Sequence, residues 1–443
     1  MNPIEEKIRK INREYHYFNT IADDIEEQQK NSRGKLAGKL ISIKDCICVK
    51  GMESTAGSKI LSTYKPLFDA TVVERIRAEG GIIIGKTSQD EFGFGSFNIN
   101  VGVDFKVPLN PHDKTRVTGG SSGGAAGATL LLDNHIAIAE STGGSIVTPA
   151  SFCGVFGLCP TYGLVSRYGL MDYANSLDKI GPMAKTMKDI ALALTIIAGY
   201  DEKDSTSTNK EKEKYGAYLG QDIKELKIGV VKEFKQGFQD AVQKKFDEAI
   251  KKLQNAGAQI KEISLPLTTE YALSCYYIIA TSEASTNLAK YCGLRYGYTE
   301  DLEGSYNEFF AKIRSNGFGK EAKRRIILGT FARMAGYRDA YYIKALKVRT
   351  KIIQEYKKAF EEVDIIATPT MPILPPKFEE IEKLSPLQNY LMDILTVGPN
   401  LAGMPHLNVP IGKEKNLPVG LLLTANHFEE KKLIQVGDWY ERN

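Results

Sequence analysis

Residues 118–145 hold the stretch that decides the fold. The segment 118–127 reads Thr-Gly-Gly-Ser-Ser-Gly-Gly-Ala-Ala-Gly, and the segment 141–145 reads Ser-Thr-Gly-Gly-Ser. Glycine lets a backbone approach a substrate closely and adopt angles that are closed to other residues. Ser121 and Ser145 each follow a Gly-Gly pair, so each can stand among free backbone N–H groups. An acyl-transfer nucleophile needs that setting.

The segments beside these two turns predict regular structure. Ala125 to Leu132 is predicted to be a helix that starts just after Gly124, and Ile136 to Ala139 is predicted to be a buried strand. Flexible linkers share the Gly/Ser composition of the turns. Here, however, a helix follows the first turn directly and the second turn follows a strand, so both turns are predicted to belong to a folded unit.

Strand and helix signals alternate along most of the chain. Strands are expected at 82–84, 227–231, 259–263, 364–367, 407–409 and 418–423, and helices at 185–198, 239–256, 321–360 and 428–441. The longest helix is expected to break near Gly329 or Gly336. This alternation predicts an α/β architecture around a mixed sheet. We expect residues 1–35 to form a peripheral helical segment, residues 36–443 the main domain, and 201–221 a charged surface connection.

The composition argues against several classes of protein. The chain has 443 residues and a formal net charge of +4, without the long Lys/Arg run that would indicate nucleic-acid binding. It contains no run of about 18 apolar residues that could cross a membrane, and residues 1–13 lack the apolar core of a signal peptide. The 6 cysteines form no CxxC pair and the 5 histidines are scattered, which indicates reduced thiols and no metal site. We therefore expect a cytoplasmic protein.

One segment matches a nucleotide-binding pattern by accident. Residues 80–87, Gly-Gly-Ile-Ile-Ile-Gly-Lys-Thr, fit GxxxxGK[ST], in which a strand leads into a phosphate-binding loop. Here three isoleucines occupy the loop positions and favour a strand themselves, and a helix signal at 70–79 precedes them. The context predicts a helix, a turn and a strand, and no ATP site on this chain.

A serine nucleophile needs a base, and Lys44 is the candidate. No histidine stands in a recognisable triad context, and His135 is expected to be a core or edge residue. A lysine can act as a base when burial lowers its pKa from about 10.4 toward neutrality. Ile41 and Ile43 flank Lys44 in an apolar strand. From the residues alone, a solvated lysine at a sheet edge is an equal alternative.

Together these segments resemble the amidase-signature enzymes over nearly the whole chain. The matching residues are Lys44-Asp45, 119–124 (Gly-Gly-Ser-Ser-Gly-Gly), 142–146 (Thr-Gly-Gly-Ser-Ile), 149–154 (Pro-Ala-Ser-Phe-Cys-Gly) and 157–163 (Gly-Leu-Cys-Pro-Thr-Tyr-Gly). Within that family, residues 165–170, 176–182, 317–321, 324–326, 336–342, 400–405 and 417–421 resemble the subgroup of glutamine-hydrolysing subunits of tRNA-dependent amidotransferases.

The resemblance implies a fold and a catalytic triad. The fold is a central mixed sheet with helices on both faces. Ser145 would be the nucleophile, Ser121, next to a cis peptide bond, the middle serine, and an uncharged Lys44 the base. Backbone N–H groups around Thr142, Gly143 and Gly144, together with that of Ser145, would form the oxyanion hole.

The resemblance also implies how substrate is held. Arg325 would bind the α-carboxylate of glutamine through its guanidinium fork, and Asp393 would bind the α-ammonium. Tyr276 falls where a substrate-contacting tyrosine is expected. Each has an alternative: Arg325 as a surface residue beside Arg324, Asp393 as a solvated helix residue, and Tyr276 as a packing residue.

Partners follow from the same resemblance. The chain would hydrolyse glutamine and supply ammonia to B and C subunits of an amidotransferase, which would amidate Glu-tRNA(Gln) or Asp-tRNA(Asn). ATP and Mg would be used by a partner, and charged tRNA would be bound mainly there, with no cofactor on this chain. The alternatives are a free-standing amidase acting on another small amide and a catalytically silent scaffold in such a complex.

The sequence departs from the family pattern near the nucleophile. Ser141 and Val147 stand where relatives usually carry Asp and Arg, and we interpret them as a neutral pair that replaces a structural ion pair. Leu40 and Cys46 replace a common proline and a common asparagine around the lysine strand. None of these changes removes a residue of the triad.

Overall fold

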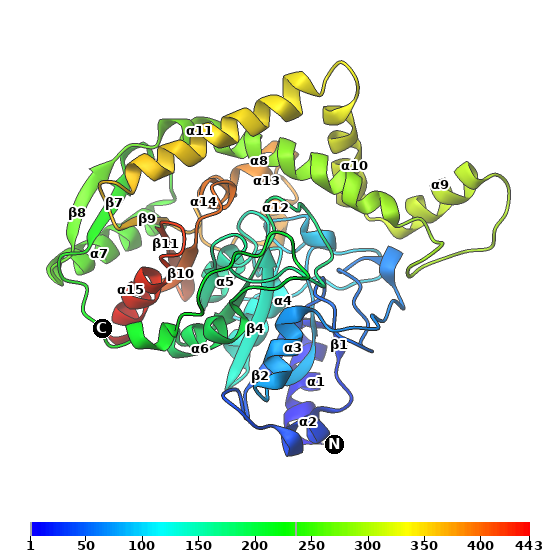
Figure 1. The fold of residues 1–443 in the computed structure, drawn as a ribbon, viewed down its shortest axis with the longest axis horizontal. Helices are drawn as coiled ribbons and strands as arrows, with labels where there is room; N and C mark the ends of the chain where they lie inside the picture. The colour runs from blue at the N-terminus through cyan, green and yellow to red at the C-terminus, as the bar shows by residue number, and fades with distance from the viewer. Residues whose placement is uncertain (1, 235–236) are drawn as a thin grey trace.

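A computed structural model describes residues 2–234 and 237–443 as helices packed around one large sheet (Figure 1). The sheet has 11 strands in the order β1-β3-β2-β4-β6-β5-β10-β11-β9-β7-β8. The strands are β1 (Phe18–Ile21), β2 (Leu40–Lys44), β3 (Ile82–Thr87), β4 (His135–Ser141), β5 (Phe156–Cys159), β6 (Lys179–Ala184), β7 (Lys227–Val231), β8 (Gln259–Ile263), β9 (Ile365–Pro369), β10 (His406–Glu414) and β11 (Leu417–Ala425). Both parallel and antiparallel pairs occur, so the prediction of a mixed α/β sheet is confirmed.

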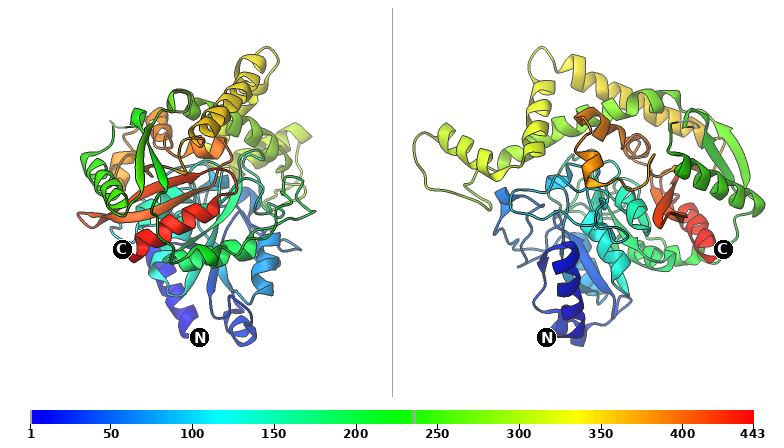
Figure 2. Two further views of the ribbon diagram at one scale, coloured as in Figure 1. Left: turned by 60° about the vertical axis from the view of Figure 1, so that its left-hand side comes forward. Right: turned by 180° about the vertical axis from the view of Figure 1, so that it is seen from behind.

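Helices surround this sheet in the three views of Figures 1 and 2. They are α1 (Pro3–Tyr15), α2 (Ile25–Asn31), α3 (Thr71–Ala78), α4 (Gly123–Leu131), α5 (Val147–Cys153), α6 (Met187–Ile197), α7 (Asp240–Asn255), α8 (Pro266–Asn287), α9 (Tyr306–Gly317), α10 (Lys320–Arg333), α11 (Lys344–Ala359), α12 (Phe378–Ile381), α13 (Pro386–Leu391), α14 (Val397–Leu401) and α15 (Glu430–Arg442). Among the described helices, none is long and apolar enough to cross a membrane.

Strand β4 shows why both faces of the sheet are covered. All of its residues are buried, and alternate residues of a strand point to opposite faces. Ala137 and Ala139 pack in one apolar cluster with α4 and α5, whereas Ile136 and Ile138 pack in another that includes α3 and α6. The alanines let the small-residue helix α4, which starts at the first serine turn, lie close to the sheet. Both serine turns are thereby fixed to the core.

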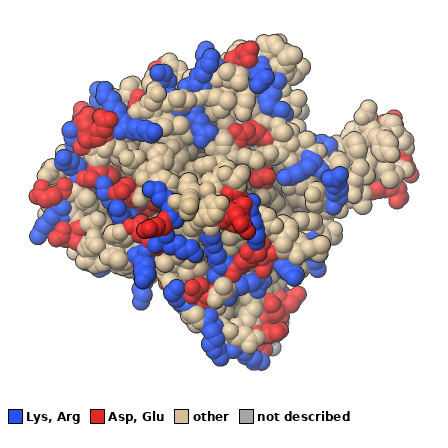
Figure 3. Space-filling model, viewed as in Figure 1, with Lys and Arg blue, Asp and Glu red and all other residues tan. Residues whose placement is uncertain are grey.

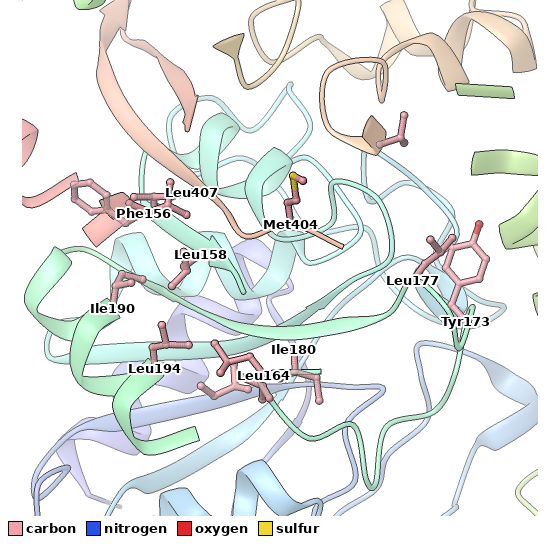
Figure 4. Packing of buried hydrophobic residues seen from close by; sticks show 14 of the residues in the cluster. Phe156, Leu158, Leu164, Tyr173, Leu177, Ile180, Ile190, Leu194, Met404 and Leu407 are labelled. Carbon is pink, nitrogen blue, oxygen red and sulfur yellow. The ribbon is translucent and has the colours of Figure 1, made fainter. Parts of the chain in front are cut away.

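The second apolar layer is the larger one. In Figure 4, Ile190 and Leu194 of α6 lie beside Leu158 and Phe156 of β5, and Leu407 of β10 lies next to them. These side chains are buried almost completely. Burial of each removes apolar area from water and contributes on the order of 1.5–3 kcal/mol before conformational entropy is counted. This layer anchors the strands that carry the serine turns.

The N-terminal segment contributes more than helices. It contains α1 and α2, but residues 18–21 form β1, which pairs antiparallel with β3 at the edge of the sheet. Polar residues dominate this segment, so the local signal for a strand is weak. Cross-strand pairing and packing of Phe18 in a cluster with Ile82 and Ile84 place β1 there.

Helices α8, α10 and α11 form a layer above the sheet, along the top of Figure 1. The helical stretch expected over 321–360 is broken between α10 and α11, with Gly336 at a backbone φ of +87° in the break. The helix does not break at Gly329, which lies within α10. A side chain at this position would clash with α8, since an added Cβ would lie 1.8 Å from the carbonyl oxygen of Thr281. Close packing of α10 on α8 therefore requires that glycine.

The expected helix, turn and strand at 70–87 are also confirmed. Helix α3 ends at Ala78, Gly80 turns the chain at a φ of +78°, and the isoleucines begin β3. Lys86 is buried and lies 3.6 Å from the carboxylate of Asp45. Because its cation is already paired within the sheet, this segment is not a phosphate-binding loop.

Candidate active site

The ends of two neighbouring strands bring Lys44 close to Ser121 and to Glu140, which lies just before the turn that holds Ser145. Strands β2 and β4 are adjacent and parallel, so their carboxyl ends meet at the same edge of the sheet. Lys44 is the last residue of β2, and the turn 142–146 follows β4 and leads into α5. Ser121 lies just before α4, which packs on β4.

Lys44 is fully buried, and three acceptors surround its ammonium nitrogen. Its Nζ lies 2.7 Å from Ser121 Oγ, 2.9 Å from the Glu140 carbonyl oxygen and 2.9 Å from Glu140 Oε2. The solvated alternative for Lys44 is therefore wrong. A lysine held in this way can exchange a proton with the Ser121 hydroxyl.

The Ser121 turn is built on close backbone contacts. The peptide bond between Gly120 and Ser121 is cis. An added Cβ on Gly120 would lie 2.2 Å from Asp90 Oδ2, so no larger residue fits at this position. The Asp90 carboxylate also accepts N–H bonds from Asn98 and Asn100. Asp90 therefore ties the segment 96–100 to the serine turn, and burial raises its pKa to about 6.

The Ser145 turn is equally tight. Ser145 is buried to all but 6% of its surface. An added Cβ on Gly143 would lie 2.9 Å from the hydroxyl of Tyr276, and one on Gly144 would lie 2.5 Å from Thr396 Oγ1. The Asn400 amide donates to the carbonyl oxygen of Thr142 and so fixes the start of the turn. Small residues here let the side chains of Tyr276 and Thr396 reach the turn that holds Ser145.

Arg325 lies buried on α10, in a ring of aromatic side chains. Its Nη1 donates to the Tyr173 hydroxyl at 2.6 Å, and its Nε donates to Glu321 Oε1 at 2.9 Å. Its guanidinium also faces the rings of Phe94 and Tyr277 at 5.2 and 5.4 Å. The surface-residue alternative for Arg325 is wrong, because only 2% of this residue is exposed.

Asp393 is joined to the same group by a tyrosine that sequence reasoning missed. Tyr277 donates its hydroxyl to Asp393 Oδ2 at 2.6 Å while its ring faces Arg325. Asp393 is buried, so its solvated alternative is wrong; burial raises the pKa of its carboxyl. Tyr276, the tyrosine singled out from the sequence, is also buried and reaches Gly143. Two adjacent tyrosines on α8 thus contact the two parts of the site.

A small cavity opens beside Arg325. It has a volume of about 50 Å³ and is lined by Arg324, Arg325, Glu321 and Tyr390 together with the segment 95–100. Arg324 also pairs with Glu321, but about a third of its side chain is exposed. The two neighbouring arginines therefore differ in burial while sharing one carboxylate.

Two further polar residues near Lys44, Glu140 and Asp178, were missed as site residues, and the side chain of Thr142, expected only to supply a backbone N–H group, links them. Glu140 contacts Lys44 directly, and the Thr142 hydroxyl lies 2.8 Å from Glu140 Oε1 and 2.7 Å from Asp178 Oδ1. Glu140 follows an apolar run, Ile136 to Ala139, just before the turn that holds Ser145. A lone carboxylate in such a strand is costly without a partner, and that signal could have identified it.

The structure also places three further residues that the sequence singled out, Ser141, Val147 and His135. Ser141 and Val147 are both buried, and across the sheet Ser141 pairs in register with Lys179 of β6. His135 is buried at the start of β4, away from its carboxyl end, and burial lowers its pKa to about 3. Within residues 2–234 and 237–443, no group of three or more His, Cys, Asp or Glu side chains could hold a metal ion.

Two curated proteins similar to this chain share one name. The chain is 47% identical over 429 residues to the A subunit of glutamyl-tRNA(Gln) amidotransferase from Archaeoglobus fulgidus, covering 96% of this chain and 91% of that protein. It is 49% identical over 412 residues to the protein of the same name from Carboxydothermus hydrogenoformans, covering 93% and 84%.

A solved structure agrees. The crystal structure of the glutamyl-tRNA(Gln) amidotransferase A subunit from Thermotoga maritima superposes with a TM-score of 0.83 at 36% identity, covering 99% of this chain and 90% of that one. The family model described as amidase matches residues 6–434, nearly the whole chain. Together with the buried lysine and the two serine turns, this match shows that the chain belongs to the amidase family.

Proposed function

We propose that this chain is the glutamine-hydrolysing subunit of a tRNA-dependent amidotransferase. The observation that carries the proposal is the 2.7 Å contact between Lys44 Nζ and Ser121 Oγ, beside the turn that holds Ser145. The relatives at 47% and 49% identity, both named as the A subunit of such an enzyme, support it.

In the proposed reaction, protons move along the three residues. Lys44, uncharged, takes a proton from Ser121 while Ser121 takes one from Ser145. Ser145 Oγ then bonds to the side-chain amide carbon of glutamine. When the carbon–nitrogen bond breaks, the same proton returns through Ser121 to the leaving nitrogen, which departs as ammonia. Water attacks the resulting ester by the reverse route and releases glutamate.

Backbone N–H groups of the turn 142–145 would stabilise the oxyanion. The Gly143 and Gly144 positions crowd Tyr276 and Thr396, so neighbouring side chains hold the turn against movement. Preorganised donors of this kind contribute most when the site excludes water. Ser145, at 6% exposure, meets that condition.

Arg325 and Asp393 would hold the two charged groups of glutamine. Glu321 and Tyr173 already occupy Nε and Nη1 of Arg325, so the substrate carboxylate would approach Nη2 and share Nη1. Asp393 would accept from the α-ammonium beside Tyr277. Tyr276 would line the path between this pocket and Ser145, because it lies against Gly143.

The partners follow from the proposed role. We propose that the ammonia passes to the B and C subunits of the amidotransferase in the cytoplasm, where ATP and Mg activate Glu-tRNA(Gln) or Asp-tRNA(Asn). On the face shown in Figure 3, Lys/Arg and Asp/Glu side chains are intermixed. This surface suits a chain whose partner binds most of the tRNA.

Steady-state ammonia release tests the proposal. Purified protein, alone and co-expressed with its partner subunits, is assayed with glutamine and with propionamide. We expect hydrolysis of glutamine, poor activity on propionamide, and loss on the order of 10⁶-fold in Ser145→Ala with folding intact. Preference for propionamide would indicate a free-standing amidase, and inactivity of the assembled wild type would indicate a scaffold.

Two adjacent arginines provide a matched control for substrate recognition. Arg325→Lys should raise KM for glutamine at least about tenfold, because a lysine offers a point charge where the guanidinium offers a planar fork. Arg324→Lys should change KM less than about threefold, because Arg324 is the more exposed of the two. Activity on propionamide should be equal in both variants. If Arg324→Lys raised KM for glutamine and Arg325→Lys did not, the residue that binds the carboxylate would be Arg324 instead of Arg325.

A further inference from the structure

The Glu140 side chain is the one charged partner of Lys44 in the described part of the chain. Its Oε2 lies 2.9 Å from Lys44 Nζ, and its own backbone carbonyl lies at the same distance. An ammonium has three N–H donors, and Ser121 Oγ completes the three acceptors. When Lys44 is uncharged, its two remaining N–H groups can stay on Glu140, and its lone pair then points at the Ser121 hydroxyl.

The other oxygen of Glu140 leads to a second buried carboxyl. Thr142 Oγ1 lies 2.8 Å from Glu140 Oε1 and 2.7 Å from Asp178 Oδ1. A threonine hydroxyl carries one hydrogen, so it can donate to one of these carboxyls but not to both. The other contact is a hydrogen bond only if that carboxyl is protonated and donates to the hydroxyl oxygen.

We propose that Glu140 is a positioning residue for the proposed triad: it aims Lys44 at Ser121 and shares a single proton with Asp178 through the Thr142 hydroxyl. This inference rests on the proposed function, because Glu140 acts there through Lys44. The two carboxyls together then carry one negative charge. That charge balances the ammonium that forms on Lys44 when Ser145 gives up its proton.

The surroundings assign the proton to the Asp178 side. Burial raises the pKa of the Asp178 carboxyl well above its usual range, and the Glu140 carboxylate raises it further. Asp178 also accepts from the backbone N–H groups of Tyr173 and Ala174, which fixes its orientation. Glu140 faces the Lys44 ammonium instead, with its Oε2 2.9 Å from the nitrogen.

Other titratable groups border this pair. Asp90 lies close enough to Lys44 to be stabilised by its charge, and Cys46 interacts with both Lys44 and Glu140. The Cys159 thiol also interacts with Glu140. Burial raises the pKa of both thiols, which keeps them protonated near neutral pH, and it raises the pKa of Asp90 to about 6. Measurements at pH 8 therefore separate the carboxyl pair from Asp90.

A pH profile of kcat/KM separates positioning from simple structural support. Glu140→Gln keeps the size of the side chain and one acceptor oxygen, replaces the other acceptor by an N–H donor, and removes the negative charge beside the Lys44 ammonium. We expect the acid limb of the profile to move to lower pH by about 1 to 2 units and the plateau to fall about three- to tenfold. Thr142→Ser keeps the bridging hydroxyl and should retain the wild-type position of the limb. A Glu140→Gln profile that superposes on wild type would overturn the proposal.

Infrared difference spectroscopy of the full-length protein at pH 8 tests the shared proton without any substrate. The spectrum of wild type minus that of Asp178→Asn should contain the carbonyl band of one buried, protonated carboxyl, and this band should shift in deuterium oxide. Wild type minus Glu140→Gln should show the same band, because the lone Asp178 can then ionise and accept from Thr142. Glu430→Gln, a buried carboxyl in contact with Thr161, is the control and should leave this band in place. Absence of the band from both test spectra would overturn the shared proton.

The two measurements also distinguish failure of the shared proton from failure of the proposed function. If wild type does not hydrolyse glutamine, the proposed function fails, but the infrared result still decides whether the carboxyls share a proton. If glutamine is hydrolysed and the band is missing, only the shared proton fails.

Discussion

Two buried lysines on neighbouring strands have similar burial and ion pairing but different hydrogen-bond partners. Lys44 ends β2 and Lys86 lies in β3; both are fully buried and both pair with a carboxylate, Glu140 and Asp45 respectively. Lys86 donates to Ser54 Oγ at 2.7 Å and to the Asp45 carbonyl at 3.3 Å. Lys44 instead donates to Ser121.

The difference teaches that burial and ion pairing do not by themselves mark a base. A buried lysine without a partner is costly, so structural lysines are paired as well. Burial lowers the pKa of Lys86, yet its hydroxyl partner, Ser54, belongs to neither serine turn. What distinguishes Lys44 is a contact to the hydroxyl of Ser121 and to the carbonyl of Glu140, just before the turn that holds Ser145.

The largest effect that separates the two lysines is expected at Lys44. Lys44→Ala and Ser121→Ala should each reduce kcat on the order of 10³-fold or more, because each interrupts the proposed proton path. The double variant should be little worse than either single one, since residues that act as a unit are not additive. The measurement is steady-state ammonia release with glutamine, and losses that multiply in the double variant would argue against a shared path.

The second effect concerns stability and is expected at Lys86. Lys86→Met leaves the Asp45 carboxylate buried without its cation, which should lower the free energy of unfolding by about 3 kcal/mol. Activity at low temperature should stay within about threefold of wild type, because Lys86 makes no hydrogen bond to Ser121 or Ser145 among the described contacts. Denaturant unfolding and the glutamine assay measure the two quantities.

A paired variant controls for this prediction. Asp45→Asn combined with Lys86→Met removes both charges and should recover most of the lost stability, since a buried ion pair can often be replaced by neutral groups. Loss of activity in Lys86→Met at full stability would instead make Lys86 part of the catalytic machinery, and the comparison between the lysines would fail.

The sequence was sufficient to predict most of the sheet, but from the residues alone it left open whether Lys44 is buried or solvated. The isoleucines of β3 and the alternation in β4 are strong local signals. Lys44 and Ser121 are close because Lys44 ends β2 and Ser121 precedes α4, which packs on the neighbouring strand β4. The roles of Ser145, Arg325 and Asp393 stay predictions until activity is measured.

What sequence reasoning missed depends on tertiary contacts. Helix α8 is buried on several sides, so it lacks the one-sided apolar stripe that identifies a surface helix. Tyr277 and Tyr276 are neighbours in the chain, and only packing decides that Tyr277 reaches Asp393. Glu140 pairs with Lys44 across 96 residues, a contact that one sequence does not reveal.

The smallest expected effect concerns a third buried lysine, Lys179. It lies opposite Ser141 across β4 and β6, donates to the Met404 carbonyl at 2.9 Å, and forms no ion pair within residues 2–234 and 237–443. Burial lowers its pKa. The sequence suggests that Ser141 and Val147 form a neutral pair, but the cation nearest in register to Ser141 is Lys179. Adding a carboxylate at residue 141 should therefore create an ion pair rather than an isolated charge.

Ser141→Asp tests this directly. We expect a stability within about 1 kcal/mol of wild type, because Coulomb attraction and desolvation nearly cancel in a buried pair. Burial lowers the pKa of Lys179 and a carboxylate partner raises it again, so the attraction needs both the ammonium and the ionised carboxylate. It is lost as pH falls through the pKa of the new carboxyl or rises through that of Lys179. Ser141→Asp with Lys179→Met should be about 3 kcal/mol less stable than the single variant.

Ser141→Asp with Val147→Arg, in contrast, should gain little stability over Ser141→Asp. Denaturant unfolding at pH 7 ranks the three variants, and rescue by Val147→Arg alone would restore the original pairing and remove Lys179 from it.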